Sequence, residues 1–437
     1  MTDSAGSTPA EPADPDNGVS DDNDAEATAS DLNRRRNWLR WTALGTSVVV
    51  LSVAGAGWWF YKKLDGNITT DTTAAAELRT YEKERPTPIV LDAKNILLIG
   101  SDSRSGEGND KYGRDDSGSQ RSDTTILLHL AADRQSATAV SIPRDLMVDI
   151  PSCRKPDGTR TTDQFAQFNW AFQFGGTACT IRTIEKLTGI RVDHHMVVDF
   201  SGFKDIVDAV DGVEVCLKEP VDDIQAQLEL PAGTQTLDGE QALGFVRARH
   251  GIGDGSDTQR MERQQRFLGA LFKKVQSNGV LLNPTRLYPV LDAATKSITT
   301  DPGLASLTDL YDLARSMQSV PVEKVQFMTV PRQPYSADRN RDELVQPDAE
   351  NLFERLREDG PVSVKTPDGA DAGRTDGPAD GPSTTADASP TAGSTSTAGP
   401  APTTSSTPTA GPTATAGSTP NPGPTFEGSN AAAGLCE

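Results

Sequence analysis

The stretch NILLIGSDSR, residues 95–104, gives the clearest indication of the fold. A run of four apolar residues ends at a glycine, and an aspartate and an arginine follow within four positions. A second stretch, RSDTTILLHL at residues 121–130, has the opposite order, because Arg121 and Asp123 come directly before its apolar run. Short apolar runs bounded by glycine and acidic residues are typical of buried strands. The sequence therefore predicts strands that carry acid and base at their ends.

Further strands and helices follow these two stretches. Apolar alternation predicts strands, whereas apolar residues three and four apart predict amphipathic helices. This alternation indicates an α/β domain built in layers. The expected strands are 95–100, 124–130, 137–142, 195–199 and 213–217, and the expected helices are 164–174, 179–188, 201–210, one beginning near 239 and 257–277.

Composition divides the 437 residues into five parts. We expect a disordered cytoplasmic tail (1–37), a transmembrane helix (38–61), an extracellular stalk (62–92), a catalytic domain (93–360) and a low-complexity tail rich in Pro, Thr, Ser, Ala and Gly (361–437). The formal net charge of −20 argues against a general nucleic-acid binder, which would carry a basic stripe.

The segment WTALGTSVVVLSVAGAGWWFY, residues 41–61, is uncharged and long enough to cross a bilayer. Four arginines lie within eight residues before it, and only two lysines follow it closely. The positive-inside rule therefore predicts a single-pass membrane protein with a cytoplasmic N-terminus and an extracellular catalytic domain. The alternative is a cleaved signal peptide, since AGA at 54–56 resembles a cleavage site.

All four cysteines follow this segment, on the side where disulfides persist. Four cysteines allow three pairings. Cys153 and Cys179 are the first expected pair because they flank one loop-and-helix segment, whereas Cys436 is a candidate for attachment back to the domain. None of the cysteines has the C-x-x-C spacing of a zinc or redox site.

The charged residues gather where a sheet would place its ligands. In open α/β sheets, ligands bind outside the carboxyl ends of the strands. Asp102 and Arg144 follow expected strands, and Arg121 and Asp123 introduce one. If that strand is antiparallel to its neighbours, all four side chains reach one edge. Two carboxylates at this edge are suited to Mg²⁺, with a phosphate completing its coordination.

More arginines follow in FVRARH and SDTQRMERQQRFL. Arg247 and Arg249 lie on one face if that segment is extended, and Arg260 and Arg263 lie on one face of a helix whose expected N-cap is Asp257. Cations at a helix start oppose its dipole unless an anion binds there. Taken singly, each arginine is more simply a solvated surface residue. The whole set favours a pyrophosphate-binding clamp, since arginine suits phosphate oxygens.

These motifs resemble the LytR-CpsA-Psr family. NILLIGSDSR, RSDTTILLHL, SIPRDLMVDIP, NWAFQFGG, VVDFSGFKDIVDAVDGVEVCL and LDGEQALGFVRARH occur in the family's order over roughly residues 93–275. The resemblance implies an α/β/α domain around a mixed central sheet, with a long apolar pocket for a polyprenyl chain. It implies a phosphotransferase that moves a glycopolymer from a polyprenyl-pyrophosphate carrier onto peptidoglycan through a phosphodiester, releasing polyprenyl phosphate.

The same resemblance assigns roles to residues. Asp102 and Asp123 would hold Mg²⁺, or Mn²⁺ in its place, and Asp257 would assist deprotonation of the acceptor hydroxyl. The arginines expected to bind the pyrophosphate are Arg121, Arg144, Arg247, Arg249 and Arg260, with Arg104 and Arg263 as further substrate-binding residues. The helices at 164–174 and 181–190 could line the apolar pocket, but ordinary core is the better expectation for both.

Two other functions use the same features. A pyrophosphatase acting on polyprenyl or nucleotide pyrophosphates would use the same residues with water as the acceptor. A membrane-bound regulator or scaffold of envelope synthesis would require an informative cytoplasmic part, and the acidic N-terminal segment offers none. The leading hypothesis has the membrane, a lipid-linked glycan donor and a peptidoglycan acceptor as partners, and no nucleic acid.

Overall fold

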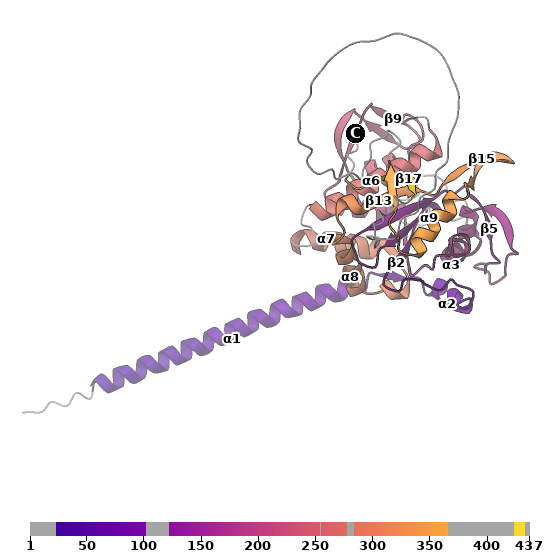
Figure 1. Cartoon of the computed structure of the whole chain (residues 1–437). Coiled ribbons are helices and arrows are strands. Elements are labelled where there is room, and N and C mark those ends of the chain that lie inside the picture. The colour runs from indigo at the N-terminus through magenta and orange to yellow at the C-terminus, as the bar shows by residue number, and fades with distance from the viewer. Residues whose placement is uncertain (1–22, 102–121, 254, 278–283, 366–423, 433–437) are drawn as a thin grey trace, which may run out of the picture. The chain divides into compact units, whose positions relative to one another are not determined.

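The computed structural model describes residues 23–101, 122–253, 255–277, 284–365 and 424–432 (Figure 1). The chain divides into two compact units, Met1–Lys63 and Leu64–Glu437. The first is dominated by helix α1 (Asn23–Asp65). Within the described residues, one helix, Asn37–Asp65, is long and apolar enough to cross a membrane. This finding agrees with a single-pass anchor.

The second unit is built on a nine-stranded mixed sheet. Strand β3 is antiparallel to both β2 and β4, whereas β2 and β7 are parallel. The ends of β2 and β4 and the start of β3 therefore share one edge, as expected. The strand order is β1 (Thr69–Thr70), β12 (Ile298–Thr300), β7 (His194–Val198), β2 (Lys94–Ser101), β3 (Ser122–Leu130), β4 (Ala137–Ile142), β13 (Val325–Thr329), β17 (Thr425–Asn430) and β16 (Ser363–Lys365).

Helices cover both faces of the sheet, which gives the layered α/β architecture predicted from the sequence. Because side chains alternate along a strand, Leu97 and Leu127 belong to the core under α3 and α9, whereas Leu98 and Ile126 face the opposite side, toward α6 and α8. The bounds of these helices are α3 (Asn169–Thr188), α6 (Asp257–Ser277), α8 (Leu307–Gln318) and α9 (Asp348–Arg357).

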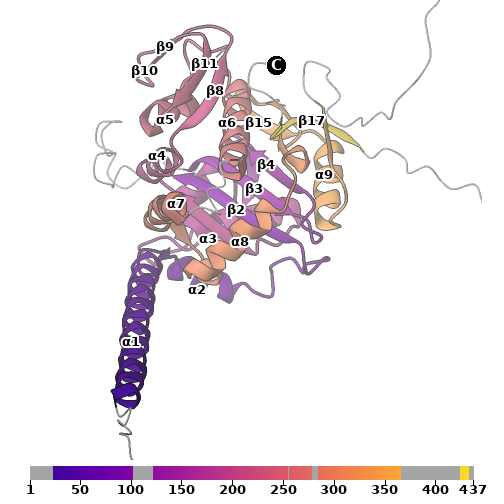
Figure 2. The same ribbon diagram turned by 90° about the vertical axis from the view of Figure 1, so that its left-hand side faces the viewer.

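A smaller second core lies at one end of the sheet. It joins α4 and α5 to two short antiparallel strand pairs and to α6, around residues such as Val213, Leu237, Phe245 and Phe267. Figure 2 shows this group at the top of the molecule. Its elements are α4 (Phe200–Ala209), β8 (Val213–Leu217), β9 (Val221–Asp223), β10 (Leu228–Leu230), β11 (Gly233–Leu237) and α5 (Gly239–Arg247).

The expected helix at 164–174 is wrong in its first part. Residues Gln164–Gln167 form β6, which pairs antiparallel with β5 (Met147–Ile150). Helix α3 begins at Asn169 and continues to Thr188, across a break at Gly175 and Gly176. The two expected helices are therefore one interrupted helix. Both segments are core, as expected, because Phe168, Phe172, Ile181 and Ile184 are all buried.

Gly175 also explains how α3 reaches the loop before it. Cys153 and Cys179 form a disulfide with a Cα–Cα distance of 5.5 Å, which confirms the expected pair. A Cβ at Gly175 would lie 2.9 Å from the Cβ of Cys179 and 3.0 Å from that of Cys153. Glycine is therefore required for this close approach. Cys216 lies in β8, and Cys436 lies outside the described residues.

The expected stalk is part of the folded unit. Its segments form β1, at the edge of the sheet, and helix α2 (Thr72–Thr80), which buries Ala74 and Leu78. After α2, Arg85 donates hydrogen bonds to Glu185 in α3 at 2.7–3.0 Å. This segment was expected to be a stalk, but the buried apolar side chains of α2 lie on one face and pack against the domain.

The expected low-complexity tail also contributes to the sheet. Strand β17 lies between β13 and β16, and its Phe426 is 6% exposed. This segment differs from the sequence before it because it contains an aromatic residue, which gives it an apolar group to bury. The region 361–437 is therefore not uniformly low-complexity tail. Its residues 366–423 lie outside the described residues.

Candidate functional site

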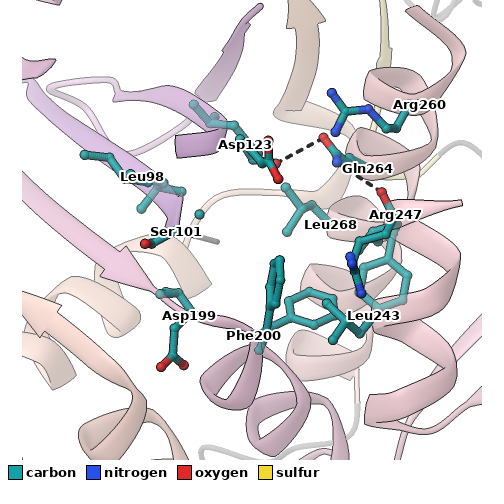
Figure 3. Close-up of a pocket in the computed structure, with 18 of the residues that line it drawn as sticks. Leu98, Ser101, Asp123, Asp199, Phe200, Leu243, Arg247, Arg260, Gln264 and Leu268 are labelled. Atoms are coloured by element: carbon teal, nitrogen blue, oxygen red, sulfur yellow. Dashed lines mark hydrogen bonds between the residues drawn. The ribbon is translucent and has the colours of Figure 1, made fainter. Parts of the chain in front are cut away.

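Most of the predicted site residues that the structure describes converge on one pocket of about 510 Å³. The pocket opens at the shared edge of β2, β3 and β4 and extends between the sheet and helices α4, α5 and α6 (Figure 3). Asp102, Arg104 and Arg121 lie outside the described residues. The predicted residues that line the pocket are Asp123, Arg144, Arg247, Arg249 and Arg260.

Asp257 brings three arginines together at the mouth of the pocket. Its Oδ1 accepts hydrogen bonds from Arg260 at 2.8 and 3.2 Å and from Arg249 at 3.3 Å. Arg144 Nη2 lies 3.9 Å from the same oxygen, and Arg144 Nη1 donates to Asp123 Oδ1 at 2.9 Å. The arginines that were predicted to lie together therefore come from three separate segments, and Asp257 Oδ1 lies close to all three of them.

The electrostatics of this cluster favour an anion. Burial lowers the pKa of Arg249, and the positive charges of Arg144 and Arg260 lower it further. For Arg144, burial acts in the same direction, but the carboxylates of Asp123 and Asp257 outweigh it and raise the pKa. Arginines remain charged in proteins, so the unfavourable crowding at Arg249 is relieved by binding a further negative group.

Asp257 is the first residue of α6, and the expected N-cap assignment is wrong by one position. Ser256 Oγ accepts from the backbone N–H of Gln259 at 3.3 Å, so the serine caps the helix. Asp257 is thereby released to contact the arginines. Its Oδ2 is buried and has no hydrogen-bond partner among the described residues. A buried carboxylate oxygen without a partner is suited to a cation or to a hydrogen-bond donor of a ligand.

Asp223 is a site residue that the sequence did not reveal. It is 2% exposed and accepts four backbone hydrogen bonds. Two of them, at 2.9 and 2.8 Å, come from Arg249 and His250, and the others come from Gln225 and Ala226, both at 3.0 Å. Asp223 therefore fixes the turn that carries Arg249. Its partners are backbone amides, which no pattern of side chains reports.

The structure places two other predicted arginines differently. Arg247 ends helix α5, so it is not in an extended segment with Arg249, and its guanidinium lies 4.8 Å from the Phe200 ring centroid. Arg263 lies outside the pocket and donates to the backbone carbonyls of Phe245 and Ala248. Burial and the charge of Arg260 lower the pKa of Arg263 to about 10. Arg263 thus holds α5 against α6.

The interior of the pocket is apolar. Residues from the sheet form its floor, and α4, α5 and α6 form its walls (Figure 3). Gln264 crosses between them, donating to Val246 O at 3.1 Å. A cavity with charged groups at its mouth and hydrocarbon walls fits a ligand with an anionic head and an apolar chain. The main apolar residues are Leu98, Ile126, Met196, Phe200, Phe203, Leu243, Phe267, Leu268 and Leu271.

Of the two residues predicted to bind Mg²⁺, Asp102 and Asp123, the structure describes only Asp123. Asp123 lies at the pocket mouth, whereas Asp102 lies outside the described residues. The described residues contain no cluster of three or more His, Cys, Asp or Glu side chains that could hold a metal alone. Mg²⁺ is commonly held by one or two carboxylates together with substrate phosphates, so this donor set fits Mg²⁺ with a phosphate ligand.

Comparison with known proteins agrees with this geometry. Residues 64–358 match the model of the LytR_cpsA_psr family. The cell wall biosynthesis protein LcpA of Corynebacterium glutamicum is 33% identical over 309 residues, which are 65% of this chain and 58% of LcpA. The chain thus spans less than two thirds of that relative.

Two further relatives extend the comparison. The polyisoprenyl-teichoic acid–peptidoglycan teichoic acid transferase TagU of Enterococcus faecalis is 32% identical over 276 residues, covering 62% of this chain and 80% of TagU. A crystal structure of a Streptococcus agalactiae protein has the same fold, with a TM-score of 0.51 and 23% identity. That alignment covers 64% of this chain and 90% of the other.

Proposed function

The chain belongs to the LytR-CpsA-Psr family, and from this premise we propose that it transfers a glycopolymer from a polyprenyl-pyrophosphate carrier onto peptidoglycan. The acceptor hydroxyl oxygen forms a bond to the phosphorus that carries the glycan. The bond from that phosphorus to the bridging oxygen breaks, and the bridging oxygen leaves with polyprenyl phosphate. The hydroxyl proton passes to a carboxylate of the enzyme.

This proposal rests on the combination of arginines and apolar side chains in one pocket. Arg144, Arg249 and Arg260 meet at the mouth of a cavity whose interior is apolar. A free nucleotide or a soluble phosphate would match the mouth but would leave the hydrocarbon walls unused. A polyprenyl pyrophosphate matches both parts. The name of the E. faecalis relative, a transferase acting on a polyisoprenyl-linked polymer, supports the same substrate class.

The chemistry assigned to the residues is positioning and neutralisation of charge. Phosphoryl transfer depends on stabilising negative charge on the phosphate oxygens and on the leaving group. The guanidinium groups of Arg144, Arg249 and Arg260 bind these oxygens as planar donors, and Arg247 supplies a further positive charge beside Phe200. Arg121 remains a predicted member of this set.

Asp257 is the carboxylate that we assign as proton acceptor. Its Oδ1 is held by arginines, and its Oδ2 has no partner among the described residues. A general base must lie within hydrogen-bond reach of the proton that it removes. We assign this role to Asp257 because its side chain lies beside the arginines that would bind the phosphates.

Mg²⁺, or Mn²⁺ in its place, belongs to the proposal. Asp123 and the predicted ligand Asp102 would hold the ion, which when bound neutralises charge on the phosphates. Helix α1 supplies the proposed membrane anchor, with the N-terminus in the cytoplasm and the catalytic unit outside. This placement puts the site on the side of the membrane where peptidoglycan lies.

The test uses the full chain in detergent with a lipid-pyrophosphate oligosaccharide, Mg²⁺ and a peptidoglycan oligomer. Wild type is compared with Arg144→Ala and Asp123→Asn, and Arg286→Ala on the exposed surface of α7 (Pro284–Ser297) is the control. We expect a phosphodiester product from wild type and from the control. Each site variant should lose about 10²–10³ in rate, the effect of removing one charge-stabilising group.

The comparison without peptidoglycan distinguishes the proposal from its alternatives. Release of polyprenyl phosphate at the same rate with and without acceptor, and with no coupled product, would establish a pyrophosphatase instead. Tight binding of the lipid without turnover in any form of the protein would make the chain a non-catalytic carrier or scaffold. Product formation that does not require a divalent cation would contradict the metal assignment.

A further inference from the structure

A second cavity, of about 390 Å³, adjoins the first across the end of β7. Met196 and Val198 line the first pocket, whereas Val197 lines the second, because alternate side chains of a strand face opposite sides of the sheet. Ser101 and Asp199 line both cavities. In Figure 3 the hydroxyl of Ser101 and the carboxylate of Asp199 point away from Asp123 and Arg260. These two residues therefore form the partition between the cavities.

The chemistry of the second cavity differs from that of the first. Carboxylates and hydroxyls make up most of its polar lining, which also contains one amine; these residues include Asp71, Asp199, Asp205, Lys296, Ser297 and Thr299. Such groups form hydrogen bonds with a neutral ligand that has many hydroxyls, and the excess of carboxylates disfavours a phosphate. The volume is within the range of small-molecule pockets, about 300–1,000 Å³.

A buried histidine behind the lining has an unused hydrogen-bonding atom. His195 is 2% exposed, and its Nε2 has no hydrogen-bond partner among the described residues. Asp71 Oδ2 lies 3.8 Å from this nitrogen, beyond hydrogen-bond reach. His195 lies on the same face of β7 as Val197. His195 does not itself line the cavity, but Asp71 does, so the histidine lies directly behind a carboxylate of the cavity wall.

Asp205 provides an ionisable group at the opposite wall, on α4. Burial raises its pKa, and the negative charges of Asp208 and Asp199 raise it further, whereas the lysines Lys204 and Lys296 oppose this shift. The carboxylate is therefore destabilised in its charged form. Hydrogen bonds from ligand hydroxyl groups would relieve that penalty.

We propose that the second cavity binds a sugar of the peptidoglycan acceptor and directs its hydroxyl past Ser101 and Asp199 toward the phosphates in the first pocket. This inference rests on the proposed function, and it assigns the acceptor to a site separate from the lipid donor. The donor occupies the apolar pocket on one face of the sheet. The acceptor sugar occupies the polar cavity on the other, and the two meet at the carboxyl end of β7.

Two variants of the full chain in detergent test the inference. Asp205→Asn removes a charge with little change in shape, and Thr299→Tyr places a ring in the cavity from β12. Neither residue lines the first pocket. Asp312→Asn, an exposed residue of α8, is the matched control. Two quantities are measured: the KM for a peptidoglycan oligomer and for the lipid-linked donor during transfer, and direct binding of a peptidoglycan oligomer without donor.

We expect Asp205→Asn to raise the acceptor KM and weaken direct binding by about tenfold, the effect of losing one hydrogen bond to a charged group. The donor KM should be unchanged, and the control should behave as wild type. Equal acceptor binding in wild type and both variants would overturn the inference, as would a donor KM that rises together with the acceptor KM. If wild type binds the oligomer but transfers nothing, the proposed function fails, and the direct-binding comparison still decides the acceptor site.

Discussion

At the scale of single residues, Asp257 explains how arginines accumulate at a helix start. Arg260 lies in the first turn of α6, where a cation opposes the helix dipole. The carboxylate of Asp257 compensates by accepting two hydrogen bonds from that guanidinium. Asp257 therefore holds the arginines in place, and the phosphates of the proposed substrate would share their donors.

Asp223 supports the first prediction. Burial alone would raise its pKa, but hydrogen bonds from four backbone N–H groups outweigh burial and hold the pKa below its ordinary value. Because the folded pKa lies below the unfolded value of about 3.9, this carboxylate stabilises the fold above about pH 4. The contribution is lost as the pH falls through the folded pKa.

We expect Asp223→Asn to lower the free energy of unfolding by about 1–3 kcal/mol near neutral pH, since backbone donors lose a charged acceptor. The difference from wild type should shrink as the pH falls below about 4. Urea denaturation of both proteins across this range measures it. A deficit that stays constant down to acid pH would show that the charge of Asp223 does not hold the Arg249 turn.

Only part of the site was predictable at this scale. Asp123 and Arg144 were predictable because each lies at the end of an apolar strand, and strand ends of a mixed sheet meet at one edge. Asp223 was not, because its partners are backbone amides brought to it by a turn. Arg263 was placed with the other arginines by helical spacing, but spacing does not report that Phe245 and Ala248 carbonyls occupy it.

At the scale of elements, helices α4, α5 and α6 form the walls of the apolar pocket. Leu268 of α6 projects into it (Figure 3). We expect Leu268→Trp to shorten the space for the lipid and to raise the KM for long-chain donors more than for short-chain donors. Each methylene excluded from the pocket weakens binding by about 0.8 kcal/mol.

The measurement is the donor KM for two polyprenyl chain lengths. Leu91→Trp is the matched control, since Leu91 is 76% exposed and does not line the pocket. A KM that rises equally for both chain lengths would mean that Leu268 does not contact the lipid chain. That result would require a different location for the polyprenyl group.

Strand β17 carries a prediction about stability. Phe426 is 6% exposed and belongs to the core under α3 and α9. We expect Phe426→Ala to lower the free energy of unfolding by about 3–5 kcal/mol, as for other buried phenylalanines. Glu427→Ala, at the exposed neighbouring position, should change it by about 0.5 kcal/mol or less. Chemical denaturation of the full chain measures both, and equal stability of the two variants would show that β17 is not part of the fold.

Elements differed in how well the sequence predicted them. The ranges of β4, β8 and α6 were predictable because each has a regular apolar pattern of its own. Strand β6 is four residues long and continues directly into α3, so its pattern merged with that of the helix. Strand β17 follows a long polar segment, and only tertiary packing against β13 and β16 reveals its role.

At the scale of the whole molecule, the net charge of the chain is opposite in sign to the charge at the pocket mouth. The chain has a net charge of −20, yet the pocket mouth gathers arginines. The net negative charge discourages nonspecific anions, and the local positive field suits the proposed ligand, whose phosphates would enter with an apolar chain. The membrane helix expected from the sequence agrees with such a lipid substrate.

In the proposed reaction, one site transfers a glycan phosphate to a peptidoglycan hydroxyl rather than to water. Turnover of the full chain in H₂¹⁸O, with lipid-linked donor and peptidoglycan oligomer, distinguishes these two acceptors. We expect a phosphodiester product without ¹⁸O and an equal amount of polyprenyl phosphate, because the acceptor hydroxyl supplies the new oxygen. Glycan phosphate labelled with ¹⁸O, with no coupled product, would contradict this account.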